Sequence, residues 1–417
     1  MSLLARTRRI DRDVDLVTFA GADGLLFERS RVGIAGRGEA LRVDWPAGDP
    51  SSAARRAAQT LASVAVDDEV GRPGCGAVAF GALPFVPGSA ASLVVPSLVV
   101  GRGDDGTRWV TTVGPDDDPR HDRPAEDLVA EVPPTPALPP PRSITVASAL
   151  EPDDWCDLVE RATKVLAEGH ATGALSKVVL AREVLVTGDR PFDRVAVLER
   201  LRTTFPGCHV VSVGPLICAS PELLVARTGD TVRSHPMAGT APRGGDPTTD
   251  QRLAASLLAS ATYRTEHQFT IDMVHDTLLG WCSYLDYEAE PSVVPVANLQ
   301  HLATLVEGRL SQPAPSVLEL VAALHPTPAV SGFPREAAVE WILEHEGFER
   351  GLYAGTVGWA DGQGNGTWAV SLRCAELSGA TARVVAGNGI VSDSDPLTEL
   401  AETRMKLQAL LTALVRP

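Results

Sequence analysis

The chain has 417 residues, of which 44% are hydrophobic and 22% are charged. This is the balance of an ordinary globular protein with a substantial core. The formal net charge of -16 argues against a nucleic-acid partner, because phosphates would be repelled. A small anionic substrate stays compatible with this charge, since it needs only local positive charge or a metal ion.

The sequence shows no membrane span and no secretory signal. The most apolar stretch, Leu93–Val100, is short and contains Pro96, so it is typical of a strand. No apolar region follows the basic residues of segment 1–12. Six cysteines are scattered without CxxC spacing, which favours reduced thiols over a zinc site. We therefore expect a cytoplasmic protein with no membrane partner.

Three parts follow one another along the chain. Residues 1–132 alternate short apolar runs, predicted as strands at Leu25–Phe27, Ala77–Phe80 and Leu93–Val95, with a predicted helix over Ala53–Val66. Residues 133–145 are rich in proline and predict a stiff connector. Residues 146–417 form the third part, and we expect all three to make one compact body.

The third part alternates predicted helices and strands, with more hairpin signals than parallel crossovers. We therefore predict an α/β protein of the α+β type, with large, mostly antiparallel sheets packed as a sandwich and flanked by helices. The predicted helices cover Asp153–Glu168, Val195–Thr203, Asp250–Leu279 and Arg335–Leu343; the predicted strands include Ser176–Arg182, His209–Val213 and Leu223–Ala226; Ala238–Gly245 is predicted as a glycine-rich loop and Gly362–Gly366 as a hairpin turn.

The segment Ser371–Lys406 holds the most suggestive pattern. A predicted strand, Thr381–Ala386, breaks at Gly387 and Gly389, and a helix begins near Pro396. Glu399, Glu402 and Lys406 share one face of that helix, because residues three and four apart are neighbours. The pattern indicates either a solvated helix face or a site for a metal ion and an anionic substrate.

Three charged residues upstream allow similar alternatives. Lys177 opens an apolar strand, so it is either a strand-end charge that reaches solvent or a desolvated amine that can take a proton near neutral pH. Glu222 follows a proline turn and is either a turn carboxylate or a partly buried general acid. Glu266 lies in mid-helix and could complete a magnesium site with the Glu399 and Glu402 helix. His301 and His325 are interpreted as packed or loop histidines.

Taken together and in order, these features resemble the chorismate-utilising enzymes, the family of anthranilate synthase component I, and most closely their isochorismate synthase branch. The resemblance is dense from residue 146 to 414. The segments that carry it are Lys177–Arg182, Ser220–Leu224, Pro236–Thr240, Glu266–His267, His301–Thr304, Leu324–Pro334, Gly355–Trp359 and Ala386–Lys406.

The resemblance implies a reaction that adds water to C2 of chorismate and expels the C4 hydroxyl. By this resemblance Lys177 is the general base and Glu222 the general acid. Mg²⁺ is the implied cofactor, with Glu266 and Glu402 as ligands and Glu399 acting through water. The implied substrate-binding residues are Gly239, Thr240, Arg373, Gly387, Gly389 and Lys406.

The resemblance also orders the branches of the family. By this resemblance Lys177 indicates that the nucleophile is water rather than ammonia, so we expect no amidotransferase subunit. The resemblance also favours a monomer. Salicylate-forming relatives share Lys177 and Glu222 and then eliminate pyruvate, so a salicylate synthase remains an alternative. Isochorismate feeds menaquinone, siderophore and salicylate synthesis, and menaquinone is our first choice.

The chain departs from the family pattern at two places. Segment Ser260–Thr265 replaces a usual Lys-Asp pair, and Asn388 replaces a usual small residue between two glycines. Asparagine tolerates the turn, but we expect its amide to alter the pocket beside the substrate carboxylate. These departures keep open a second alternative, a relative that binds chorismate without turning it over.

Overall fold

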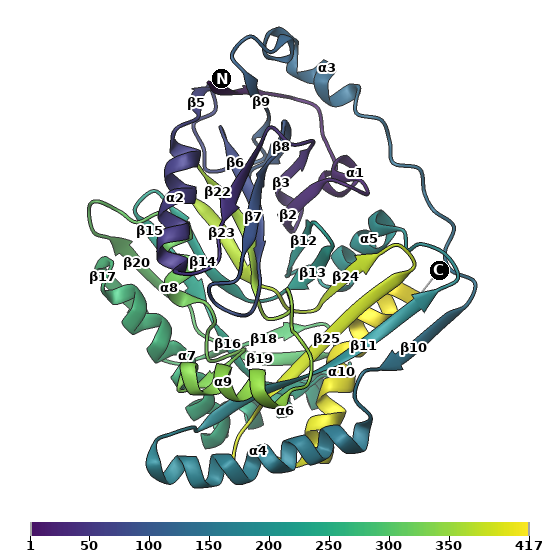
Figure 1. Cartoon of the computed structure of the whole chain (residues 1–417), viewed down its shortest axis with the longest axis vertical. Coiled ribbons are helices and arrows are strands. Elements are labelled where there is room, and N and C mark those ends of the chain that lie inside the picture. Colours follow the sequence, from purple (N-terminus) through teal and green to yellow (C-terminus); the bar gives the residue numbers. More distant parts are fainter. Residues whose placement is uncertain (1, 416–417) are drawn as a thin grey trace.

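The computed structural model describes residues 2–415, except for the side chains of residues 170–172 and 409. It has the predicted mixed α/β architecture, with large antiparallel sheets and flanking helices (Figure 1). None of the described helices is long and apolar enough to cross a membrane.

The larger sheet has 13 strands, and all its pairings are antiparallel except that between β1 and β5. Its order in space is β10 (Ile144–Ser148), β11 (Lys177–Gly188), β25 (Thr381–Ile390), β24 (Cys374–Ser378), β13 (Leu216–Ser220), β12 (His209–Val213), β2 (Leu25–Arg29), β3 (Val32–Arg37), β8 (Leu98–Arg102), β9 (Arg108–Pro115), β1 (Leu3–Arg9) and β5 (Ala65–Asp68), with β21 (Gly332–Phe333) beside β11.

Two further sheets, of nine and three strands, complete the β structure. The nine-stranded sheet has the order β17 (Cys282–Tyr287), β20 (Val306–Leu310), β15 (Thr231–His235), β14 (Leu223–Thr228), β23 (Gly366–Val370), β22 (Thr356–Asp361), β6 (Val78–Leu83), β7 (Ala91–Val95) and β4 (Leu41–Trp45). The three-stranded sheet has the order β16 (Met237–Pro242), β19 (Leu299–Ala303) and β18 (Ser292–Val296). One hydrophobic cluster holds Phe27 and Val99 of the larger sheet together with Phe80 and Val225 of the nine-stranded sheet, so the two large sheets share a core.

The helices cover the outer faces of these sheets. They are α1 (Leu16–Ala20), α2 (Pro50–Ala62), the 3-10 helix η1 (Pro119–Asp122), α3 (Ala125–Ala130), α4 (Pro152–Thr172), α5 (Arg194–Thr204), α6 (Pro247–Ala259), α7 (Ala261–Leu279), α8 (Val317–Leu324), α9 (Arg335–His345) and α10 (Pro396–Val415). Helix α10 packs on β25 and on α4, and α7 packs on β16 and β17 (Figure 1). These contacts place α7 and α10 at the same end of the molecule.

The connector joins parts that also pair directly. It forms no helix or strand between residues 131 and 143 and runs along the edge of the molecule from α3 to β10 (Figure 1). Strand β2 pairs with β12, and β6 pairs with β22, so strands from both sides of the connector lie side by side. The division of the chain at residues 133–145 stays a prediction.

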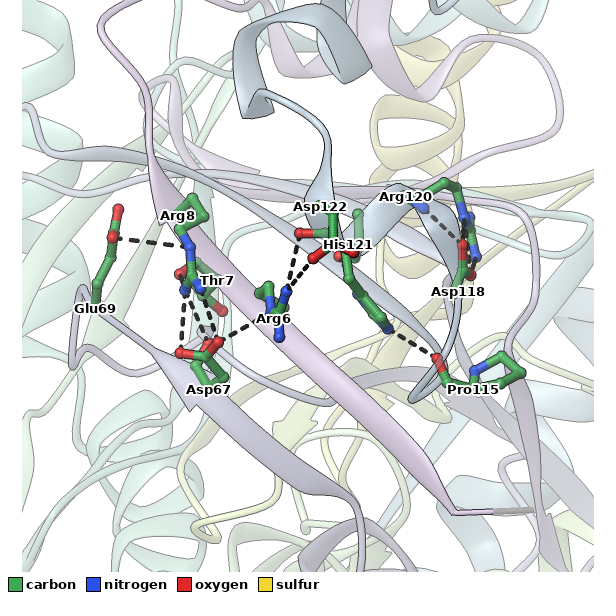
Figure 2. Close-up of polar contacts among 11 residues, drawn as sticks. Arg6, Thr7, Arg8, Asp67, Glu69, Pro115, Asp118, Arg120, His121 and Asp122 are labelled. Carbon is green, nitrogen blue, oxygen red and sulfur yellow. Dashed lines mark hydrogen bonds and ion pairs between the residues drawn. The ribbon is translucent and has the colours of Figure 1, made fainter.

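A polar network holds β1 near the far edge of the larger sheet (Figure 2). Arg6 contacts the carboxylates of Asp67 and Asp122, at 2.9 and 3.0 Å. Arg8 Nη2 lies 2.7 Å from Asp67 Oδ2, and His121 Nδ1 lies 2.8 Å from Thr112 Oγ1. These contacts tie β1 to β5 and to the segment after β9.

Several predicted elements were wrong in extent. The apolar stretch Leu93–Val100 is divided at Pro96 between β7 and β8. The predicted helix Asp250–Leu279 is two helices, because the Ser260 hydroxyl accepts a hydrogen bond from Tyr263 N and caps a new helix. The predicted loop Ala238–Gly245 is strand up to Pro242, because β19 pairs with it. The strand at Thr381 runs through both glycines to Ile390, because β11 pairs with it along its length. The helix predicted over Ala53–Val66 ends at Ala62, and the last two residues of the predicted range, Ala65 and Val66, belong to β5.

Candidate active site

Ten of the eleven predicted site residues line one cavity of about 140 Å³. The cavity lies between β25, β16, α7 and α10. The lining residues among those predicted are Glu222, Gly239, Thr240, Glu266, Arg373, Gly387, Gly389, Glu399, Glu402 and Lys406. The eleventh, Lys177, lies behind the wall of the cavity, where its side chain contacts Glu266.

Lys177 is fully buried at the start of β11, with 0% of its surface exposed. The solvated interpretation of this residue is therefore wrong. Its Nζ lies 2.8 Å from Glu266 Oε1. An amine in this place is desolvated and held next to the cavity, which fits a group that exchanges a proton there.

Glu222 lies in the short turn between β13 and β14 and is only 2% exposed. Burial raises the pKa of its carboxyl to about 8, although a hydrogen bond from Met237 N–H and the charge of Lys177 act in the opposite direction. The side chain therefore keeps its proton near neutral pH. This is the protonation state that a general acid needs.

Arg373 presents a cationic group to the cavity. The side chain is buried, and the backbone has a positive φ of 46°. Among the described residues, no carboxylate lies within ion-pair distance of its guanidinium. Its Nη2 lies 3.0 Å from His301 Nε2. Because a guanidinium can only donate, His301 Nε2 must accept this bond, and its Nδ1–H then donates to Gly239 O at 3.2 Å. A buried guanidinium without a carboxylate suits an anionic ligand that binds through a planar carboxylate.

His301 is buried, as predicted for a packed histidine, but it also bonds to a charged residue of the site. The ring links Arg373 to Gly239 and Thr240 of β16 and lines the cavity. His325 is a packed histidine as predicted, and its Nε2 lies 3.1 Å from both Pro84 O and Phe85 O. Sequence spacing could not separate the two histidines, because both stand in similar apolar surroundings.

Three carboxylates face the cavity but do not converge on one point. Glu266 pairs with Lys177, and Glu402 Oε1 lies 2.8 Å from Lys406 Nζ. Burial, followed by the charge of Glu402, raises the pKa of Glu399 to about 7. Across the described residues, no three Asp, Glu, His or Cys side chains lie close enough together to hold a metal ion as they stand. Two lysines, Lys177 and Lys406, therefore hold two of the three carboxylates in this arrangement.

The chemistry of this donor set nevertheless fits a divalent cation. Carboxylate oxygens are the ligands that Mg²⁺ prefers, and Glu402 lies close enough to Glu399 for its charge to raise the pKa of the Glu399 carboxyl. A bound cation would remove this repulsion and would compete with Lys177 and Lys406 for Glu266 and Glu402. The role of the three carboxylates as ligands stays a prediction.

Gly387 and Gly389 bring β25 into close contact with the charged groups. Lys406 Nζ donates to Gly387 O at 2.8 Å. A Cβ at Gly389 would lie 2.5 Å from Glu266 Oε1 and 2.8 Å from Lys177 Cε. A side chain at Gly389 would therefore displace the ends of Glu266 and Lys177, and the turn predicted there from the sequence is absent.

The two departures from the family pattern have different positions in the site. Tyr263 lines the cavity, and burial together with the charges of Glu402, Glu399 and Glu266 raises the pKa of its phenol. The Asn388 side chain instead points to Glu399, where its Nδ2 donates at 2.7 Å to the backbone carbonyl and at 3.0 Å to the carboxylate. Asn388 therefore does not alter the cavity wall directly, contrary to our expectation.

Comparisons with known proteins agree with this geometry. The sequence profile of the chorismate binding enzyme family matches residues 25–415. The chain is 40% identical over 357 residues to a putative isochorismate synthase MenF of Mycobacterium tuberculosis, across 82% of this chain and 88% of that protein. It is 37% identical to the isochorismate synthase DhbC of Bacillus subtilis, across 80% of each chain.

Two solved structures share the fold. A putative 2,3-dihydroxybenzoate-specific isochorismate synthase, DhbC of Bacillus anthracis, has a TM-score of 0.77 and 30% identity, over 95% of this chain and 96% of that one. The menaquinone-specific isochorismate synthase MenF of Escherichia coli has a TM-score of 0.80 over 99% of this chain and 95% of that one, and its 24% identity supports the fold alone. The chain belongs to the chorismate binding enzyme family.

Proposed function

We propose that the protein is an isochorismate synthase, an isomerase that converts chorismate into isochorismate. The observation that carries the proposal is the pair of buried proton-transfer groups, Glu222 and Lys177, beside one cavity that also holds unpaired positive charge. The similarity to proteins named isochorismate synthase, at 37 to 40% identity over most of each chain, supports the same activity.

The two proton-transfer groups perform complementary steps in this proposal. Lys177 takes a proton from the water molecule that forms a bond with C2 of chorismate. Glu222 gives its proton to the C4 oxygen, so the C–O bond at C4 breaks and water leaves. One water is consumed and one is released, and Lys177 and Glu222 recover their starting states by proton exchange with solvent. Both groups are needed because water is a weak nucleophile and hydroxide a poor leaving group.

The positive groups of the cavity bind the substrate. Chorismate carries two carboxylates, and we assign Arg373 and Lys406 to them, with the backbone at Gly387 and Gly389 close by. Gly239 and Thr240 line the side of the cavity at which His301 bonds to β16, and we assign these two residues to the binding of the substrate ring. These groups allow a protein with a net charge of -16 to bind a dianion.

We assign Mg²⁺ to Glu266, Glu402 and Glu399. When bound, the ion supplies positive charge that neutralises a substrate carboxylate. Without the ion, the three glutamates would repel an anionic substrate, so substrate binding would require a cation.

The proposal extends to the setting of the enzyme. We place it in menaquinone synthesis, supported by the relative named MenF; the relative named DhbC makes siderophore synthesis the competing assignment. We also propose that it acts as a cytoplasmic monomer without an amidotransferase subunit. Restored growth of a menaquinone-requiring bacterial strain that lacks isochorismate synthase would support the pathway assignment, and failure despite activity in vitro would contradict it.

A product assay tests the activity. Purified protein is incubated with chorismate and Mg²⁺, and the products are separated by chromatography. We expect isochorismate as the main product. Salicylate and pyruvate as main products would move the protein to the salicylate synthases, and well-folded protein that binds chorismate without turnover would make it a non-catalytic relative.

A further inference from the structure

Three consecutive residues of β25 each hold one charged residue of the site. The carbonyl of Gly387 accepts a hydrogen bond from Lys406, and the backbone at Gly389 lies against Glu266. Between them, the side chain of Asn388 bonds to Glu399. Strand β25 therefore lies against charged residues of both α7 and α10, and Asn388 is the one of the three residues that contacts its partner through a side chain.

Donors occupy both carboxylate oxygens of Glu399. Asn388 Nδ2 donates to Oε2 at 3.0 Å, and the Ser394 hydroxyl donates to Oε1 at 2.9 Å. Asn388 Nδ2 also donates to the backbone carbonyl of Glu399 at 2.7 Å. Since both acceptors on this side are oxygens, the amide must present its nitrogen to them, which fixes its orientation.

Asn388 is buried, with 2% of its surface exposed, and its Oδ1 has no hydrogen-bond partner in the described part of the chain. A buried carbonyl oxygen without a partner is unfavourable, so packing alone would favour a small apolar side chain here. The two hydrogen bonds to Glu399 are the feature that offsets this disadvantage. One of them, together with the Ser394 hydroxyl, orients the Glu399 carboxylate.

We propose that Asn388 is a positioning residue, which holds the Glu399 carboxylate in the orientation that binds a divalent cation together with Glu402. This inference rests on the magnesium assignment of the proposed function. Partners that orient a metal-binding carboxylate commonly change metal affinity by one to two orders of magnitude when they are removed. Asn388 itself does not line the cavity, so it acts through Glu399.

Titration of the substrate-free enzyme with Mg²⁺ in a calorimeter tests this role. For Asn388→Ala we expect the Kd for Mg²⁺ to rise about tenfold. The Mg²⁺ concentration that gives half the maximal rate should rise in parallel, while kcat at saturating Mg²⁺ stays within about twofold, because the variant still holds every group that touches the substrate.

Asn298→Ala is the matched control. Asn298 Nδ2 also donates to a carbonyl of α10, that of Met405 at 3.2 Å, and its Oδ1 also has no partner among the described residues. This variant should lower the melting temperature without changing the Kd for Mg²⁺. If Asn388→Ala behaves in the same way, Asn388 only stabilises the fold and the inference is overturned.

Two further arms keep the test decisive. If Asn388→Ala does not fold, Ser394→Ala removes the other donor to Glu399, and an unchanged Kd in that variant overturns the inference. A wild-type enzyme that makes isochorismate equally well without any divalent cation overturns the inference but leaves the proposed activity standing. If the wild-type enzyme makes no isochorismate, but Asn388→Ala binds Mg²⁺ less tightly than wild type, the result supports the inference and contradicts the proposed activity.

Discussion

Burial decides which chemistry the charged residues of the cavity can perform. Glu222 and Glu402 are both glutamates of one cavity, yet Glu222 is buried with no ion-pair partner in the described residues, whereas Glu402 is paired with Lys406. Burial raises the pKa of Glu222 to about 8 and so keeps it protonated as an acid. Lys177 is also buried, and its amine is paired with Glu266 beside the cavity.

The role of Lys177 predicts a specific loss in Lys177→Met. Methionine fills similar space but cannot take a proton, so kcat should fall about a thousandfold, within the range that a general base contributes. Chorismate should still raise the melting temperature, because Arg373 and Lys406 remain.

Lys164→Met is the control for this change, since Lys164 forms an exposed ion pair with Glu160 at 2.9 Å. It should leave kcat unchanged. A Lys177→Met enzyme with near wild-type turnover would show that Lys177 is not the base.

Glu222→Gln should change stability in a direction set by pH. The pKa of Glu222 in the folded protein, about 8, lies above the usual value of 4.5. At pH values between these two, the folded protein therefore binds one more proton than the unfolded chain. The free energy of unfolding of the wild type therefore falls as pH rises from about 4.5 to about 8. In Glu222→Gln this fall in the free energy of unfolding should be absent, because a glutamine side chain does not ionise.

Thermal unfolding at several pH values measures this effect. The melting temperature of Glu222→Gln relative to wild type should be higher at pH 8.5 than at pH 5, while activity is lost at every pH. A difference in melting temperature that does not vary with pH would contradict the raised pKa.

At the scale of elements, the register of β25 against β11 and α10 assembles the site. The sequence predicted a strand, a glycine break and a helix, because apolar runs, glycine and proline act locally. It could not predict that the strand continues through Gly387 and Gly389, since that depends on pairing with β11, about 200 residues away in sequence. For the same reason it identified the charged residues of the site but not the ion pairs of Lys177 with Glu266 and of Lys406 with Glu402.

Gly389→Ala tests the importance of this close approach. The added Cβ would lie 2.5 Å from Glu266 Oε1 and 2.8 Å from Lys177 Cε, so the Lys177–Glu266 pair must move. We expect at least a tenfold loss of kcat/KM, because an error of about 1 Å in a catalytic group commonly has a large effect.

Gly207→Ala is the matched control, because a Cβ there meets no atom within 4 Å. Steady-state kinetics of both variants, with circular dichroism to confirm folding, provide the comparison. Equal activity of the two variants would contradict the tight packing around Glu266.

At the scale of the whole molecule, the N-terminal part belongs to the same sheets as the site. The sequence predicted the fold class from alternating helices and hairpins, and its resemblance to one family is dense only after residue 146. Composition could not show that β2 pairs with β12 or that β6 pairs with β22, because pairing between distant strands leaves no local signal.

This shared architecture predicts that residues 133–417 do not fold by themselves. Removing residues 1–132 would expose the edges of β12 and β22 and one side of the common core. We expect the truncated protein to be aggregated or to lack a cooperative thermal transition. A soluble fragment with a sharp transition and bound chorismate would contradict this prediction.

In the proposed reaction the enzyme adds a water molecule to C2 of chorismate and removes the C4 oxygen, with Lys177 and Glu222 as base and acid. Turnover in water enriched in oxygen-18, followed by mass spectrometry and nuclear magnetic resonance of the product, tests it most directly. We expect isochorismate that carries one labelled oxygen, bonded to C2. Isochorismate without the label would show that the original hydroxyl moves within the substrate, and it would contradict the assigned roles of Lys177 and Glu222.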